Sequence, residues 1–160
     1  MGVVLAVMVP TFVRHLRVSK ISEATQMLRT LHQKTASYFE TPHGSLGAMH
    51  CLPESAGPAP SMPSTELKHV DFYDAAMPGQ ATWKSLGFRP AHPIRYRYTL
   101  ETMHAGCHVK GPPMKPLVTF KAEGDLDGDG QRSTFLRAAG TNPKGSLIPV
   151  GTLYMHRRTE

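Results

Sequence analysis

Apolar side chains recur at steps of three and four residues between positions 12 and 39, which is the spacing of one face of an α-helix. Charged and polar side chains, among them Arg14, Lys20 and Lys34, occupy the positions between them. The apolar positions are Phe12, Val13, Leu16, Ile21, Ala24, Met27, Leu28, Leu31, Tyr38 and Phe39. This pattern predicts a long amphipathic helix that ends at the Thr-Pro-His-Gly sequence of residues 41–44.

A nearly continuous apolar run, residues 2–9, precedes this stripe. The run is much too short to cross a bilayer, which requires roughly 20 residues. No basic residue precedes it and no small-residue cleavage site follows it, so it is not a complete secretory signal. Because proline lacks the backbone N–H donor and clashes with the preceding turn, we expect the helix to kink or unwind locally at Pro10.

The second half of the chain alternates between apolar and polar side chains. Residues 94–100, 117–122 and 133–138 show this period of two, and residues 151–155 form a shorter segment of the same kind. Such segments are typical of half-buried strands. Residues 82–88 predict one turn of helix ended by glycine, with its tryptophan and phenylalanine buried.

These elements predict an α+β fold, in which a long N-terminal α-helix, kinked near Pro10, packs on a C-terminal antiparallel β-sheet head. We expect three regions: the helix in residues 1–40, a connecting loop region rich in proline and glycine in residues 41–80, and the sheet head in residues 81–160. Four prolines within residues 44–63 exclude a helix or a central strand from that stretch.

Composition agrees with a single domain that is rich in turns. The chain has 160 residues, with 14 prolines and 14 glycines, and its formal net charge is +6. A chain of this length buries enough surface to fold alone. The positive charge permits acidic partners without identifying one.

The N-terminal pattern resembles a known family. Residues 3–39, with the Leu-Ala-Val-Met-Val-Pro run and the Ser-Glu-Ala sequence at 22–24, are similar to the N-terminal helix of type IV pilins and of the pseudopilins of type II secretion systems. The later segments 83–88, 96–98, 120–130 and 133–135 are similar to the head pattern of pilin-like proteins that contain a Gly-Asp-Leu-Asp-Gly-Asp sequence. The resemblance covers most of the chain and is weak in residues 51–77.

The resemblance implies a pilin-like fold and the structural subunit of a type IV pilus-like filament, which serves adhesion, motility or surface attachment. The subunit would lie in the inner membrane before assembly and then in a helical filament of identical subunits on the bacterial cell surface. The residues implied to assemble are Val3, Val4, Leu5, Val7, Val9, Pro10, Phe12, Val13 and Leu16. The family's leader peptide, the glycine of its processing site, and the phenylalanine and glutamate that follow are absent, because the chain begins inside the apolar segment.

Two alternatives stay open. One is either a pseudopilin of a type II secretion system or a DNA-binding minor pilin. Arg95 and Arg97, interleaved with Tyr96 and Tyr98, offer the charge and the rings that nucleic acid binding uses, although alternation places the tyrosines inward. The other is a soluble basic binding module whose apolar start is a core helix.

Catalysis has little support in the sequence. The chain contains no Gly-x-Ser-x-Gly sequence, no phosphate-binding glycine loop ahead of a helix and no His-Glu-x-x-His sequence. We therefore expect that the protein is not an enzyme and has no small-molecule substrate.

The most specific local motif is Asp125-Leu-Asp-Gly-Asp-Gly130. Carboxylates at alternate positions, followed by glycine, match the opening of a calcium loop, because Ca²⁺ takes six to eight oxygen ligands. The candidate ligands are Asp125, Asp127, Asp129, Gln131 through its carbonyl oxygen and Ser133 through its hydroxyl.

Two features favour a metal-free turn at the same place. Leu136 stands where a calcium loop supplies its last carboxylate, and Arg132 adds positive charge. Aspartate and glycine are also the residues that tight turns favour. The sequence thus predicts either no cofactor or calcium.

The two cysteines, Cys51 and Cys107, allow one intramolecular pairing. For an exported protein, which the resemblance implies, we expect a disulfide. The alternative is a zinc site built with His50, His104 and His108. A structural zinc site usually has a close ligand pair on both sides, and neither cysteine has a second cysteine nearby.

Overall fold

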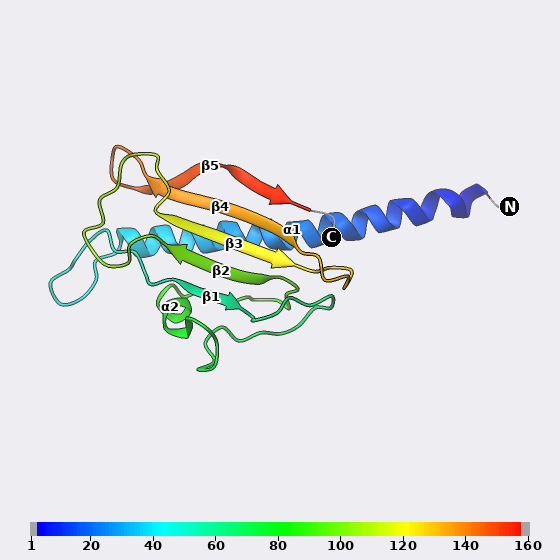
Figure 1. Ribbon diagram of the computed structural model, residues 1–160, viewed down its shortest axis with the longest axis horizontal. Helices are drawn as coiled ribbons and strands as arrows, with labels where there is room; N and C mark the ends of the chain where they lie inside the picture. Colours follow the sequence, from blue (N-terminus) through cyan, green and yellow to red (C-terminus); the bar gives the residue numbers. More distant parts are fainter. Residues whose placement is uncertain (1–2, 158–160) are drawn as a thin grey trace.

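The computed structural model describes the backbone of residues 3–157 and the side chains of residues 21–157. The described residues form two helices and five strands, and we call residues 21–157 the body (Figure 1). In chain order the elements are α1 Val3–Glu40, β1 Ala56–Ala59, α2 Gln80–Ser85, β2 Arg97–Thr102, β3 Val118–Gly124, β4 Ser133–Thr141 and β5 Leu147–His156.

The five strands form one antiparallel sheet in the order β1-β2-β3-β4-β5. Each strand therefore pairs with its neighbours along the chain. The connection between β1 and β2 contains α2, and the other connections are turns or loops. The pair β2 and β3 is in continuous register, from Arg97 opposite Glu123 to Thr102 opposite Val118. Hairpin-type connections of this kind need no crossover helix.

The alternation in the sequence decides which face of each strand is buried. Side chains of β3 alternate between buried and half-buried along its whole length. Tyr96 and Tyr98 are fully buried, whereas Arg95 and Arg97 are half-exposed, as the period of two predicts. Trp83 and Phe88 are also buried, and they pack with Phe72 in an aromatic cluster under β1 and β2.

Helix α1 lies against β3, β4 and β5, on the sheet face that carries the buried side chains (Figure 1). Its buried side chains are Ala24, Leu28, Leu31, Thr35 and Phe39. Thr35 is the polar member of this stripe, and its hydroxyl donates a hydrogen bond of 2.9 Å to the carbonyl oxygen of Leu31. This contact satisfies the hydroxyl inside the apolar interface.

The predicted fold class is wrong, both as an α+β fold and as a pilin-like fold with a long helix packed on a sheet head. The body is mainly β, and the described side chains of α1 come from 20 residues, Ile21 to Glu40. Alternation predicted the later strands, but it did not predict the strand at residues 56–59, because pairing at the edge of a sheet is not a local property of the sequence.

We expected a kink or local unwinding at Pro10. The backbone of α1 is helical from Val3 to Glu40, so the expectation of local unwinding is wrong, whereas the kink stays a prediction. A proline removes one N–H donor, and the hydrogen bonds of the neighbouring turns maintain the helix across that gap. The side chains proposed for assembly, Val3 to Leu16, lie outside the side chains that the structure describes.

Strand β1 lies within the region predicted as a connecting loop. It pairs with β2 through Ala56 opposite Leu100 and Ala59 opposite Tyr98, with a register shift between these pairs. Pro58 excludes a central strand, but β1 is an edge strand, where a missing N–H is tolerated on the open side. The prolines therefore restrict this segment to the edge of the sheet.

Glu23 joins the helix to the start of β2. Its carboxylate oxygen Oε1 accepts hydrogen bonds from the backbone N–H groups of Arg95, at 2.8 Å, and Tyr96, at 3.2 Å. The same oxygen lies 3.3 Å from the hydroxyl of Tyr98, which donates to it. The Arg95 guanidinium lies 3.9 Å from the other carboxylate oxygen. We call these contacts the helix–sheet junction.

Replacement of Glu23 by alanine should destabilise the body by about 1–3 kcal/mol, because two backbone N–H groups and one buried hydroxyl lose their acceptor. Glu23→Gln keeps one oxygen acceptor and should cost less. Urea unfolding followed by circular dichroism measures both. Glu40→Ala, which removes an exposed carboxylate from the same helix, is the matched control and should change stability by less than about 0.5 kcal/mol. Equal effects of all three changes would contradict the role of Glu23.

His32 is a titratable side chain in the interface between α1 and the sheet. Its ring contacts Phe120 edge to face, with 5.9 Å between the ring centroids, and its Nε2 atom is buried without a hydrogen-bond partner among the described residues. Burial, together with the positive charge of Arg137, lowers the pKa of His32 below its ordinary value of 6.5. A proton therefore binds the unfolded chain more readily than the folded one.

The unfolding free energy should accordingly fall as the pH drops from about 6.5 towards the lower pKa of His32 in the folded chain. Above pH 6.5 His32 is neutral in both states, and the stability that depends on its neutral form is fully present. His32→Gln removes the titration, so its unfolding free energy should change less than that of the wild type between pH 7.5 and pH 5. His69→Gln replaces an exposed histidine and serves as the control. If His32→Gln and His69→Gln alter the pH dependence equally, burial of His32 does not produce the effect.

Candidate functional site

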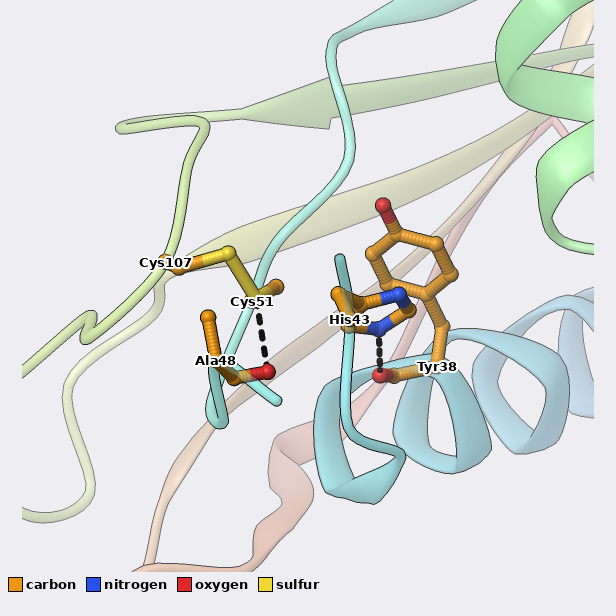
Figure 2. Close-up of a disulfide and its surroundings, with 5 residues drawn as sticks. All are labelled: Tyr38, His43, Ala48, Cys51 and Cys107. Carbon is orange, nitrogen blue, oxygen red and sulfur yellow. Dashed lines mark hydrogen bonds between the residues drawn. A yellow bond between two sulfur atoms is a disulfide. The ribbon is translucent and has the colours of Figure 1, made fainter. Parts of the chain in front are cut away.

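A disulfide joins Cys51, in the loop after α1, to Cys107, in the connection between β2 and β3 (Figure 2). The two residues are separated by 56 positions. Cys51 is buried, and its Sγ atom lies 3.5 Å from the carbonyl oxygen of Ala48. A cross-link over a loop of this length stabilises a fold by about 2–4 kcal/mol, mainly by restricting the unfolded chain.

Further contacts order the loop after α1. The Nε2 atom of His43 lies 2.6 Å from the carbonyl oxygen of Tyr38 in the last turn of α1, and the two rings are 4.0 Å apart (Figure 2). Leu52 and Gly106 exchange two backbone hydrogen bonds beside the disulfide, of 2.8 Å and 2.9 Å. Covalent and hydrogen bonds therefore hold the two loops together at one end of the body.

The alternative zinc site does not form in this arrangement. Zinc binds thiolate sulfur, and both sulfur atoms are used in the disulfide. His50, His104 and His108 are exposed on the same loops.

The acidic turn, residues 125–131, connects β3 to β4. One oxygen from each of Asp125, Asp127 and Asp129 lies within 4.8 Å of the others. Asp125 accepts hydrogen bonds from the backbone N–H groups of Gly128, at 2.8 Å, and Gly130, at 3.1 Å. Both glycines have positive φ, 82° and 86°, which lets the chain curl around that carboxylate.

Of the two remaining predicted ligands, the structure brings only Gln131 to this cluster. Its backbone N–H and side-chain amide donate to the two carboxylate oxygens of Asp129, at 2.7 Å and 2.8 Å, and its side-chain oxygen accepts from Arg157. Ser133 is buried, and its hydroxyl donates to the carbonyl oxygen of Gly124, at 3.1 Å. The three carboxylates offer the oxygen ligands that calcium prefers. Backbone N–H groups already donate hydrogen bonds to these carboxylates, so the turn is also stable without a metal.

The alternative of nucleic acid binding at β2 has no exposed ring there to stack a base. Tyr96 and Tyr98 are fully buried. Arg97 pairs with Glu123, with 2.8 Å between its NH2 atom and the carboxylate, and donates to the carbonyl oxygen of Ser61 at 3.1 Å. Arg97 is therefore paired within the body, and the two tyrosine rings are buried there, so these groups do not face a nucleic acid.

Burial also shifts the pKa values of two tyrosines, Tyr96 and Tyr98. Burial raises the pKa of Tyr96 to about 12. Burial, and then the nearby Glu23 carboxylate, raise the pKa of Tyr98 well above its ordinary value. Both hydroxyls thus stay protonated in the interface between helix and sheet.

The expectation that the protein is not an enzyme stays a prediction.

Sequence reasoning missed two hollows of the surface. One, of about 430 Å³, lies between α1 and the segment before β2 and is lined in part by Gln26, Arg89 and His92. The other, of about 640 Å³, lies in the connection between β2 and β3, beside Met103 and Leu117. Neither has a sequence motif, because the first combines α1 with residues 89–95, which are far away in sequence, and the second lies in a loop without periodicity.

Comparison with known proteins identified no matching family model, no matching curated protein and no matching solved structure. The resemblance to pilins therefore rests on the residues quoted from the sequence. Within the part of the chain that the structure describes, neither helix combines the length and the apolar character that crossing a bilayer requires.

Calcium binding at the acidic turn should be visible as added stability. If Kd is about 1 mM, as in extracellular calcium modules, 10 mM calcium should raise the unfolding free energy by about 1.4 kcal/mol. Asp127→Asn keeps the oxygen that accepts from Asp129 N–H but removes charge, and it should abolish most of the gain. Thermal unfolding with and without calcium measures this, with Glu66→Gln, an exposed carboxylate elsewhere, as control. An equal gain in all three proteins, or none, would show a metal-free turn.

Proposed function

We propose that the protein is a structural subunit of a type IV pilus-like filament, and that it assembles through the first part of α1. The observation that carries the proposal is the position of that part. Figure 1 shows α1 continuing well past the end of the sheet, so the body does not cover its first turns. In the sequence this part is the apolar stem, residues 3–16, which contains Val4, Leu5, Val7 and Val13.

The hydrophobic effect supplies the driving force for assembly. Apolar surface that remains in water costs about 25 cal/mol per Å², and copies of the same stem are available to cover it. A contact between different surfaces of identical subunits repeats along an axis and yields a helical filament unless a ring closes. The stem then lies at the filament's centre, and the body lies outside.

The same geometry supports a pseudopilin of a type II secretion system as the second candidate. The acidic turn favours it, because a calcium turn in the C-terminal part is a feature of some pseudopilins. A DNA-binding minor pilin is less well supported, since the rings beside Arg95 and Arg97 are buried. Electron microscopy separates the candidates: a filament subunit forms long fibres with this chain as the repeating unit.

Carboxylates placed in the stem should prevent assembly without unfolding the body. We expect the wild-type chain to sediment as large species, and the double variant Val7→Asp, Val13→Asp to sediment as a monomer with an unchanged unfolding midpoint. The reason is that a charge in an apolar interface between subunits is expensive to bury. Sedimentation velocity and negative-stain microscopy provide the measurements.

The matched control is Gln33→Asp, which adds a carboxylate to an exposed position of α1 where the helix lies on the sheet. It should assemble like the wild type. A wild-type chain that sediments as a monodisperse monomer would contradict the proposal and favour the soluble binding module.

A further inference from the structure

Three loops meet at the end of the body opposite the protruding part of α1 (Figure 1). They are residues 41–55, 103–117 and 142–146, and we call them the distal loops. The disulfide joins the first two, and the backbone N–H of His108 donates to the carbonyl oxygen of Met49 at 3.1 Å. The N–H of Met114 donates to the carbonyl oxygen of Thr141, at 2.9 Å, at the end of β4. The distal loops are thus held in place before any partner arrives.

The hollow of about 640 Å³ opens in the second of these loops. Its lining is largely apolar and comes from Met103, Pro112, Pro116 and Leu117, while Lys110 and Lys115 also border it. The side chain of Met103 is 65% exposed. An apolar hollow with cations at its border is suited to a group that is apolar at its centre and anionic at its sides.

Charge beside the hollow is positive. Residues 102–122 contain no aspartate or glutamate, and the other two distal loops contain one, the exposed Glu54. The same segments carry Lys110, Lys115 and Lys144. In the part of the chain that the structure describes, the ion pairs use other cations, so these lysines keep their charge for a partner.

We infer that the distal loops are a docking site for an acidic peptide segment of a partner protein, which places an apolar side chain in the hollow and carboxylates beside Lys110 and Lys115. A concave hollow receives a protruding side chain, whereas a flat bilayer does not reach its floor. The distal loops contain no Phe, Tyr or Trp on which a nucleic acid base would stack. Charge complementarity and the apolar lining together therefore favour the peptide.

The inference does not rest on filament assembly, because the distal loops lie away from the stem and are exposed in a single chain. A soluble monomer would present the same site. Failure of assembly is detected by sedimentation and failure of docking by peptide binding, so the two outcomes are distinguishable.

Fluorescence anisotropy of a labelled peptide, GEDLLDEG, titrated with the full chain tests the site. Two further peptides separate its parts: GEDSSDEG lacks the apolar side chains, and GKKLLKKG reverses the charge. We expect GEDLLDEG to bind about tenfold or more tightly than either, and its affinity to fall with rising salt. Binding of GEDLLDEG that is no tighter than that of either other peptide would overturn the inference.

The double variant Lys110→Glu, Lys115→Glu should weaken binding of GEDLLDEG by about tenfold or more. Both side chains are exposed, so the unfolding midpoint should not change. The matched control is Lys68→Glu, Lys84→Glu, which changes the net charge equally at exposed positions outside the distal loops. An equal loss in both double variants would show a response to net charge only and overturn the site.

Competition identifies other occupants. Vesicles of phosphatidylcholine with 30% phosphatidylglycerol, and a single-stranded oligonucleotide of matched charge, are added to the complex of the wild-type chain with GEDLLDEG. We expect neither to displace the peptide at equal charge concentration. Displacement that depends on Lys110 and Lys115 would assign the distal loops to a membrane or to nucleic acid and overturn the inference.

Discussion

The carboxylate of Glu23 determines how helix α1 is attached to the sheet. Apolar packing of Leu28 and Leu31 on β3 and β4 is strong but non-directional, so by itself it allows the helix to slide or rotate. Hydrogen bonds from the backbone N–H groups of Arg95 and Tyr96 to one oxygen of Glu23 are directional. They tie a single point of α1 to the start of β2. The place where the helix leaves the sheet, and hence the length that stays uncovered, follows from that attachment.

Two ends of different chemistry result from this attachment. At one end the apolar stem continues beyond the sheet, where copies of the same chain are the natural cover (Figure 1). At the other end the disulfide between Cys51 and Cys107 joins two loops, and the second of these contains an apolar hollow bordered by lysines. A subunit that buries its stem among identical neighbours keeps the opposite end in solvent. The proposed assembly and the proposed recognition would thus use surfaces that do not compete, and neither proposal depends on the other.

Much of the body was predictable, because alternation and helical spacing are local. The burial of Tyr96 and Tyr98 follows from a period of two, since successive side chains of a strand point to opposite faces. Strand β1 was not predictable, because Pro58 is compatible with a strand only at an edge, and strand order is not a local property. The acidic turn was predictable as a cluster, but Ser133 was not, because its hydroxyl bonds back to Gly124 inside the hairpin.

The sequence by itself determined the faces of the helix and strands, the composition of the acidic turn and the only cysteine pairing that the chain allows. The tertiary structure alone decided how much of α1 the sheet covers, that Glu23 serves the start of β2, and that three loops meet at one end of the body, where one of them contains a hollow. The physical reason is the range of the interactions. Periodicity reports the neighbours of a residue along the chain, whereas coverage, charge clustering and hollows depend on segments that are far apart in sequence and adjacent in space.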